Sequence, residues 1–418
     1  MIKILKLSAA TEKALLKARE SEDREAFAIA ARIVEDVRRR GDTAVEFWTK
    51  KLDKVDLVRM GFWLSRREFA GADKSVSSEF NRAMKHAAAN IRRVAEKQNP
   101  RGWKLVVERG VSIQETVRPL ESVGCYIPGG RFALVSTLLM TVIPAQVAGV
   151  RQIIVVCPRP NNELLAAANF LGITRIVRIG GAQAIAAMAY GTDRIPRVEK
   201  LFGPGNRFVT AAKQIVSNQC AIDLPAGPTE AVILAERGNA KWIAADLLAQ
   251  AEHAPDAGSF LVTTSQVLAK NVAAEVHRQL QTFSPTNVAH ASFRQTSAIL
   301  IANSMKDAIA FVNRFAPEHL SLPGKSAAVL SKIESAGTIF LGPLSAQSFG
   351  DYASGSNHVL PTGGWAHRRG GLSTSDFVKR INLQTIDGPG YKSLARDVRI
   401  LAKAEGMEAH ANSVEVRQ

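Results

Sequence analysis

The chain has 418 residues, of which 46% are hydrophobic and 22% are charged. This is enough for about two or three domains, and the composition excludes a disordered, collagen-like or disulfide-scaffold protein. The 54 lysines and arginines exceed the 38 aspartates and glutamates by 16. Because these basic residues are scattered in short groups and only 6% of the chain is aromatic, we expect no nucleic-acid partner.

The residues from 8 to 100 predict mostly helices. Apolar residues recur at helical spacing between 26 and 37, and a second helical run covers 78–96. The break at Asn99-Pro100 begins a more extended region.

An uncharged stretch of 19 residues, 132–150, is nominally long enough to span a bilayer. It contains Pro144 and several polar residues, so we expect a buried core element and no membrane partner. The N-terminus lacks an apolar region of signal-peptide length. The three cysteines form no CxxC pair, which fits a reducing, cytoplasmic location.

From about residue 120, short β-branched runs alternate with alanine-rich helical runs. The expected strands are Gln152–Cys157, Arg175–Ile179, Ala231–Ala235, Phe260–Thr264, Ala298–Ile301 and Thr338–Leu341. The expected helices between them are 162–171, 182–189, 240–250, 267–280 and 305–314. This alternation predicts an α/β fold of two Rossmann-like units with largely parallel sheets, flanked by a helical N-terminal region and a helical C-terminal tail.

Two glycine-rich loops precede helices, at Gly180-Gly181 and at Gly203-Pro204-Gly205. Both could present backbone N–H groups to phosphate oxygens. Neither matches GxGxxG with an acid about 20 residues further on. A tight turn that requires glycine is an equal alternative at each loop.

Histidines pair with a nearby acid or amide at four places in the C-terminal half. The pairs are Gln250 with His253, Glu318 with His319, Asp351 with His358, and Glu405 with His410. The first pair is separated by three positions on one predicted helix, so both side chains can reach one ion. A zinc site of imidazoles and oxygen ligands is reasonable. For any single histidine, a hydrogen-bonded surface residue is the alternative.

Several ordered segments carry a family resemblance. They include IDLPAGPTEAVILA and DLLAQAEHAPD within 222–256, GCYIPGGRFALVSTLLMTVIPAQVAGV at 124–150, FGPGNRFVTAAK at 202–213, GDYASGSNHVLPT at 350–362 and AEGMEAHANSV at 404–414. In these segments, spread over most of residues 95–414, the chain resembles the histidinol dehydrogenase family. The resemblance implies an enzyme that holds one Zn²⁺ per subunit and oxidises L-histidinol to L-histidine through histidinal, with two NAD⁺ reduced in succession.

The resemblance also implies roles for individual residues. His319 would be the general base for the alcohol, and Glu318 would activate the water that attacks the aldehyde. The zinc ligands would be Gln250, His253, Asp351 and His410. The residues that bind substrate would be Thr229, Gln250, His253, His319, Asp351, His358, Glu405 and His410. The residues that contact NAD⁺ would be Tyr126, Gln183 and Asn206.

By the same analogy the protein is a homodimer in which Glu405 and His410 act in the partner's site. The expected domains are an N-terminal arm (1–20), a discontinuous first α/β domain (21–120 and 229–368), a second Rossmann-like domain (121–228) and a tail (369–418). The first domain would hold most of the metal and substrate site, and the second would bind NAD⁺. The tail is a candidate for exchange between subunits.

The chain departs from the family pattern at three places. Thr229 stands where many members have serine, Arg131 is not the usual small residue, and Trp365–Gly371 is unusual after the LPT motif. His367 in that segment is therefore not carried over as a ligand. These departures leave an alternative, a paralogue that oxidises another polar or anionic alcohol, such as a sulfonated diol, with the same zinc and NAD⁺ machinery.

Overall fold

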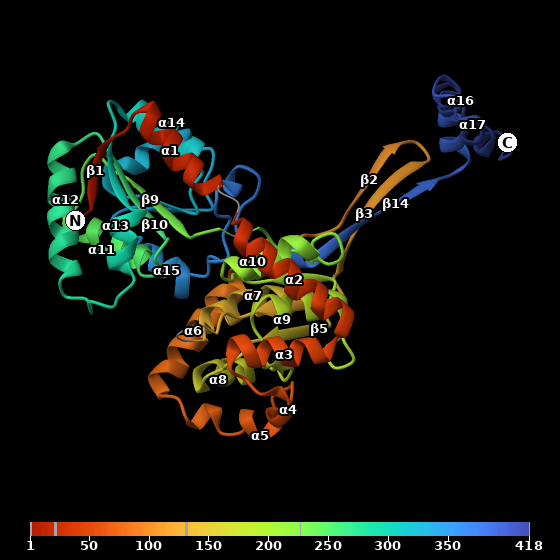
Figure 1. Cartoon of the computed structure of the whole chain (residues 1–418). Coiled ribbons are helices and arrows are strands. Elements are labelled where there is room, and N and C mark those ends of the chain that lie inside the picture. The colour runs from red at the N-terminus through yellow and green to blue at the C-terminus, as the bar shows by residue number, and fades with distance from the viewer. Residues whose placement is uncertain (1, 21–22, 130–132, 226, 418) are drawn as a thin grey trace.

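The computed structural model describes residues 2–20, 23–129, 133–225 and 227–417. Figure 1 shows two α/β units and a narrow arm that extends away from both. None of the helices in these ranges combines the length and apolar character that crossing a membrane requires. Arg131, one of the departures from the family pattern, lies outside the described residues.

The first unit is built on sheet A, whose six strands are all parallel, in the order β1-β11-β10-β9-β12-β13. Its strands are β1 (Lys3–Lys6), β9 (Glu230–Leu234), β10 (Gly258–Thr263), β11 (Ala298–Ile301), β12 (His319–Leu322) and β13 (Thr338–Leu341). One face packs on α11 (Ala240–Ala251), α12 (Gln266–Leu280) and α13 (Ala289–Gln295). The other packs on α1 (Ala9–Glu20), α14 (Met305–Phe315) and η2 (Gly324–Lys332). Coverage on both faces explains why the central strands are continuous apolar runs.

The second unit is built on sheet B, with five parallel strands in the order β6-β5-β4-β7-β8. Its strands are β4 (Ser122–Tyr126), β5 (Gln152–Val156), β6 (Ile176–Val177), β7 (Lys200–Phe202) and β8 (Ala221–Ile222). One face packs on α6 (Ser78–Gln98), α7 (Val135–Ala148) and α8 (Asn162–Phe170). The other packs on α2 (Arg24–Arg40), α3 (Asp42–Asp53), α9 (Gly181–Tyr190) and α10 (Arg207–Val216).

Short elements complete the two units: α4 (Leu57–Met60), α5 (Arg66–Phe69), η1 (Ala72–Lys74), α15 (Gln347–Tyr352), η3 (Trp365–His367) and η4 (Thr374–Phe377). The uncharged stretch at 132–150 contains α7, whose central residues are all buried in the core of the second unit. The expectation of a buried core element there is confirmed.

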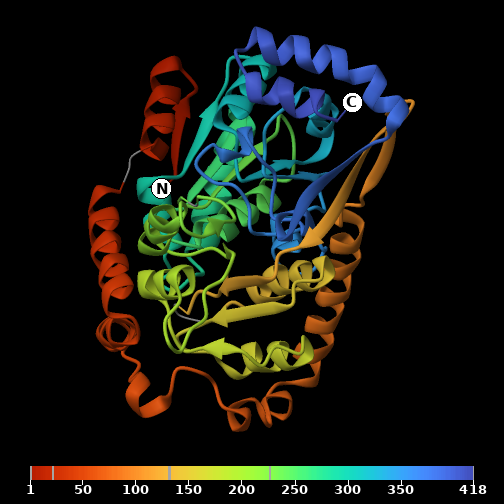
Figure 2. The ribbon, with the colours of Figure 1, turned by 90° about the vertical axis from the view of Figure 1, so that its right-hand side faces the viewer.

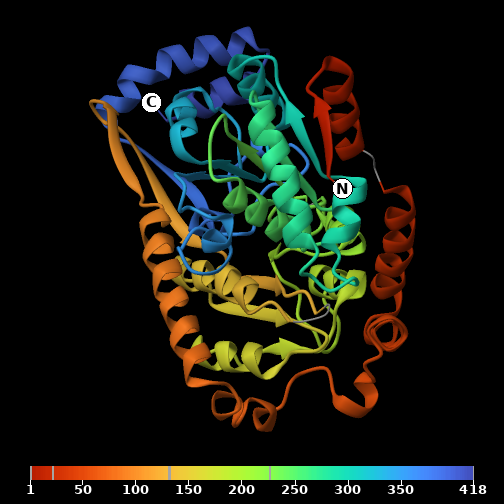
Figure 3. The same ribbon diagram turned by 90° about the vertical axis from the view of Figure 1, so that its left-hand side faces the viewer.

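The N-terminal helices correct the expected grouping of 21–120 with 229–368. Helices α2, α3 and α6 pack on sheet B, whereas β1 of the expected N-terminal arm joins sheet A beside β11. Figures 2 and 3 show the same division, with α1 beside sheet A and α2 and α3 beside the other unit. Helical periodicity shows that a helix has a buried face, but it does not identify the sheet that covers this face.

The arm is a three-stranded antiparallel sheet with two helices at its end. It consists of β2 (Trp103–Glu108), β3 (Val111–Pro119), β14 (Val378–Ile386), α16 (Gly388–Ala404) and α17 (Glu408–Glu415). The tail expected at 369–418 therefore includes a nine-residue strand before its two helices. Large apolar side chains on the arm remain exposed, among them Val106 at 64% and Leu401 at 64%. An apolar surface of this kind favours a protein partner.

Candidate functional site

Seven of the predicted site residues gather where the amino ends of the sheet A strands meet the second unit. Thr229 precedes β9, Glu318 precedes β12 and His319 begins it. Gln250 and His253 lie at the end of α11, Asp351 lies in α15, and His358 follows in a loop. The His358 Nε2 atom lies 3.0 Å from the Thr137 hydroxyl of α7, so the cluster touches both units.

Hydrogen bonds fix the acidic and amide members of this cluster. Glu318 accepts hydrogen bonds from the Thr229 hydroxyl at 2.5 Å and from the Glu230 backbone N–H at 2.9 Å. The Thr229 hydroxyl in turn accepts one from Gln250 Nε2 at 2.9 Å. Gln347, which sequence reasoning missed, donates to Gln250 Oε1 at 3.1 Å. The Thr229 hydroxyl is thus held between the Glu318 carboxylate and the Gln250 amide.

His319 is buried, with its two ring nitrogens in different surroundings. Nδ1 lies 3.4 Å from the Glu230 carbonyl oxygen, and the ring stacks on Phe340 with 5.9 Å between centroids. Nε2 lies 3.5 Å from Asp351 Oδ1 and has no hydrogen-bond partner among the described residues. This nitrogen is the atom through which His319 can exchange a proton with a bound molecule.

The charges of the cluster shift its pKa values. Burial opposes protonation of His319, but the Glu318 and Asp351 carboxylates outweigh it and raise the pKa of His319 to about 9. Burial raises the pKa of Glu318, and burial lowers the pKa of His358. Without a bound cation, His319 therefore carries a proton at neutral pH, whereas His358 is neutral.

Gln250, His253 and Asp351 offer a carboxamide, an imidazole and a carboxylate, which are N and O donors that suit zinc. His253 is close enough to Asp351 for its charge to lower the pKa of that carboxyl. No three His, Cys, Asp or Glu side chains of the described ranges are arranged to hold a metal ion. The donor set fits zinc chemically but needs at least one further donor.

Glu405 and His410 are not brought to this cluster within one chain. Both are exposed residues at the end of the arm, Glu405 directly after α16 and His410 in α17. Figure 1 shows these helices at the far end of the arm, away from β9 and α15.

The expected NAD⁺ contacts lie at the carboxyl edge of sheet B, where the strand order reverses between β4 and β7. Such a reversal point is where ligands bind in open α/β sheets. Tyr126 ends β4, and its hydroxyl accepts a hydrogen bond from the Gly181 backbone N–H at 3.1 Å. Asn206 follows β7 and caps α10 through Oδ1, which accepts from Phe208 and Val209 N–H groups. Gln183 is fully buried in the first turn of α9.

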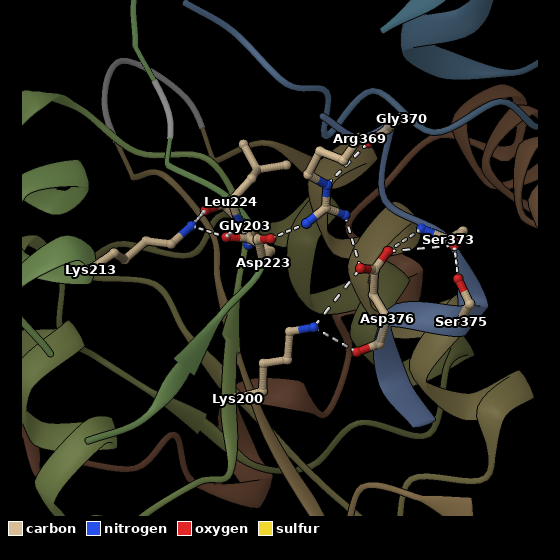
Figure 4. A network of polar contacts seen from close by, with 10 residues as sticks. All are labelled: Lys200, Gly203, Lys213, Asp223, Leu224, Arg369, Gly370, Ser373, Ser375 and Asp376. Carbon is tan, nitrogen blue, oxygen red and sulfur yellow. Dashed lines mark hydrogen bonds and ion pairs between the residues drawn. The ribbon is translucent and has the colours of Figure 1, made fainter. Parts of the chain in front are cut away.

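A buried ion pair holds the Gly203-Pro204-Gly205 loop (Figure 4). Lys213 of α10 pairs with Asp223, and both side chains are at most 3% exposed. Asp223 accepts from the Gly203 N–H at 2.8 Å, and Lys213 donates to the Gly203 carbonyl oxygen at 3.1 Å. Gly203 has φ +112°, and a Cβ there would lie 2.2 Å from the Tyr126 carbonyl oxygen. Only glycine fits this position.

The unusual segment Trp365–Gly371 makes contacts of its own. Arg369 donates to the Asp223 carbonyl oxygen and, at 2.9 Å, to Asp376 (Figure 4). The Arg368 guanidinium lies 4.7 Å from the centroid of the Trp365 ring. His367 is exposed and contacts Ser335 and the Arg314 carbonyl oxygen. Arg368 and Arg369 therefore make contacts within the protein, whatever the charge of the substrate.

Comparisons with known proteins all indicate one family. A family model described as "Histidinol dehydrogenase" matches residues 16–418. The histidinol dehydrogenase of Methanosarcina barkeri is 45% identical over 393 residues, which covers 92% of this chain and 90% of the relative. That of Geobacter sulfurreducens is 41% identical and covers 97% of this chain and 96% of the relative. The crystal structure of histidinol dehydrogenase from Elizabethkingia anophelis matches with a TM-score of 0.93 and 37% identity, over 100% of this chain and 98% of that one.

Proposed function

The chain belongs to the histidinol dehydrogenase family, whose members are NAD-dependent oxidoreductases, and we propose that it oxidises L-histidinol to L-histidine in histidine biosynthesis. The proposed reaction removes four electrons in two steps, passes through histidinal and reduces two NAD⁺. The observation that carries this proposal is the convergence of Thr229, Gln250, His253, Glu318, His319, Asp351 and His358 between the two units. The family resemblance implied a role for each of these residues before the structure brought them together.

We propose that Gln250, His253 and Asp351 hold one Zn²⁺ and that His410 of a second subunit completes the set. The exposed apolar arm supports a homodimer, because it carries Glu405 and His410 away from their own cluster. When bound, zinc would orient the substrate and offset the Asp351 charge, which favours the neutral form of His319. The free, buried cysteines fit a cytoplasmic enzyme.

In the first oxidation, neutral His319 would take the alcohol proton at Nε2. Bound NAD⁺ would supply the hydride acceptor for the carbon that bears this alcohol. The unpartnered Nε2 supports this role, and the Phe340 ring keeps the imidazole in place. His358 of the same subunit and the partner's Glu405 would bind the substrate.

In the second oxidation, Glu318 takes a proton from the water that attacks the aldehyde carbon. Burial raises the pKa of Glu318, which makes this carboxylate a stronger base near neutral pH. The hydrogen bonds from Thr229 and the Glu230 N–H keep it oriented toward the site. The hydrated aldehyde would then give up a hydride to the second NAD⁺ and its remaining acidic proton to solvent, which leaves the carboxylate.

The test is NADH formation from L-histidinol and NAD⁺, before and after chelation and after zinc is added back. We expect two NADH per histidinol, loss with the chelator and recovery with zinc. A folded, zinc-loaded dimer that forms no NADH from histidinol would contradict the substrate assignment, and a panel of other polar and anionic alcohols would then identify the class oxidised.

A further inference from the structure

The amino end of α9 is already filled by protein groups. The carboxylate of Asp53, the last residue of α3, accepts a hydrogen bond from Gln183 Nε2 at 2.9 Å, and the Gly180 N–H is near enough to favour its charged form. The Tyr126 hydroxyl occupies the Gly181 N–H. A phosphate would need these N–H groups and would meet a carboxylate beside them. This turn is therefore unsuited to a phosphate, although glycine-rich turns before helices commonly bind one.

A different kind of ligand fits the same place. Gln183 is 0% exposed, and within the described ranges its Oε1 atom has no hydrogen-bond partner. That oxygen lies against Gly181, 2.7 Å from where a Cβ would stand. A buried acceptor without a donor is rare in folded proteins and indicates a missing partner. Gln183 Oε1 lacks a hydrogen-bond donor, and the Asp53 carboxylate, which accepts from Gln183 Nε2, has lone pairs for a further donor. The hydroxyl groups of a ribose are donors of this kind.

NAD⁺ contains two riboses, and the position of Asp53 indicates which of them would lie beside its carboxylate. Asp53 lies with α3 and α9 on one face of sheet B. The substrate cluster touches α7, which covers the opposite face. Because the nicotinamide must reach the substrate, the Asp53 side of the sheet receives the remote, adenosine end.

We propose that Asp53 is a specificity-determining residue: it accepts a hydrogen bond from the adenosine ribose of NAD⁺ and excludes the 2′-phosphate of NADP⁺. A carboxylate in this role attracts hydroxyl groups and repels a phosphate. The inference rests on the NAD⁺-dependent oxidation proposed above. Asp53 comes from a helix more than 100 residues before the turn it faces, so no GxGxxG pattern could reveal it.

A nearby cation, Arg159, provides a second test of the role of Asp53. Arg159 is exposed and close enough to Asp53 to affect the pKa of its carboxyl. Once the carboxylate is neutralised, Arg159 is free to attract a 2′-phosphate. An Asp53→Asn variant should therefore gain use of NADP⁺, and Arg159→Gln in the same chain should remove that gain.

The experiment measures kcat/KM for NAD⁺ and NADP⁺ with L-histidinol. Asp53→Asn keeps a side-chain oxygen that can accept the hydrogen bond from Gln183 Nε2, so we expect it to fold. The ratio of NADP⁺ to NAD⁺ efficiency should rise at least tenfold in Asp53→Asn and return toward the original value with Arg159→Gln added. Asp193→Asn, which removes an exposed carboxylate beyond the other end of α9, should leave the ratio within twofold. An unchanged ratio in Asp53→Asn would overturn the proposal.

A binding measurement on the unaltered protein keeps this test separate from the reaction. We expect ADP-ribose to bind at least tenfold more tightly than its 2′-phosphorylated form. Equal binding of the two would refute the role of Asp53, whatever the substrate is. Absence of NADH formation from histidinol, with the difference in binding retained, would instead refute the proposed reaction alone.

Discussion

Glu318 and His319 are adjacent in the chain but lie in different settings. The carboxylate of Glu318 accepts hydrogen bonds from Thr229 and the Glu230 N–H, whereas His319 Nε2 lies near Asp351 and has no hydrogen-bond partner in the described part of the chain. The start of one strand thus carries two bases, with 3.7 Å between His319 Nδ1 and Glu318 Oε2. This arrangement suits a reaction that needs one base for an alcohol and another for water.

Replacing His319 separates proton transfer from metal binding. We expect His319→Asn to keep its zinc and to lose at least about 10²-fold in kcat on histidinol, because the proton acceptor is removed. His253→Ala should lose zinc and turnover together. Metal analysis beside steady-state kinetics checks both variants. Near-normal turnover of His319→Asn would refute its role as base, and full metal content in His253→Ala would refute its role as ligand.

At the scale of elements, the loop before α10 depends on a fully buried ion pair. Lys213→Met would leave Asp223 charged in the core, and we expect it to destabilise the fold by about 3–5 kcal/mol. Because the Gly203 loop loses its anchor, KM for NAD⁺ should rise more than KM for histidinol. Urea unfolding and the two KM values check this.

The matched control is the exposed ion pair Arg207–Asp23, because Arg207 lies on the same helix. Arg207→Met removes this cation and should lower the free energy of unfolding by only about 0–1 kcal/mol. A Lys213→Met variant as stable as Arg207→Met would contradict the anchoring role.

The short helix α5 is tied to the end of β6 by Glu68 and Arg178, whose guanidinium is 7% exposed. The hydrogen bond to Arg178 lowers the pKa of Glu68 to about 2, below its ordinary value of 4.5. A depressed carboxyl pKa stabilises the folded state above the ordinary value and stops doing so as pH falls toward the folded value.

We therefore expect the unaltered protein to exceed Glu68→Gln in free energy of unfolding at pH 6, and the difference to shrink between pH 4.5 and about 2. Denaturant unfolding across this range checks the sign. A difference that grows toward low pH would show that the ion pair is not its source.

At the scale of the whole molecule, the sequence identified both units but not how the chain is divided between them. Apolar runs such as 152–157 and 298–301 are buried on both faces and predict parallel strands correctly. Strand β12 is not predicted from the sequence, because polar site residues occupy its start. The β2–β3–β14 sheet is not predicted either, because it joins segments more than 250 residues apart. Pairing over such separations is set by tertiary contacts.

Motifs in the sequence predict which residues belong to the candidate site, but not that these residues lie close together. His253, Glu318 and Asp351 could be named from their segments, but nothing in local spacing shows that they meet. Gln347, Asp53 and the Lys213–Asp223 pair act through contacts between distant elements, so only the fold reveals them.

The arm leads to a prediction about assembly. If Glu405 and His410 complete the partner's site, a mixed dimer of His319→Asn and His410→Ala subunits contains one site with both lesions and one with neither. Each variant alone should be inactive, and equal mixing after unfolding and refolding should restore about a quarter of full activity, as statistical exchange in a two-fold dimer requires. Size-exclusion chromatography confirms the dimer, and NADH formation reports the restored sites. No recovery in a mixed dimer would place His410 in its own subunit's site, against the position of the arm.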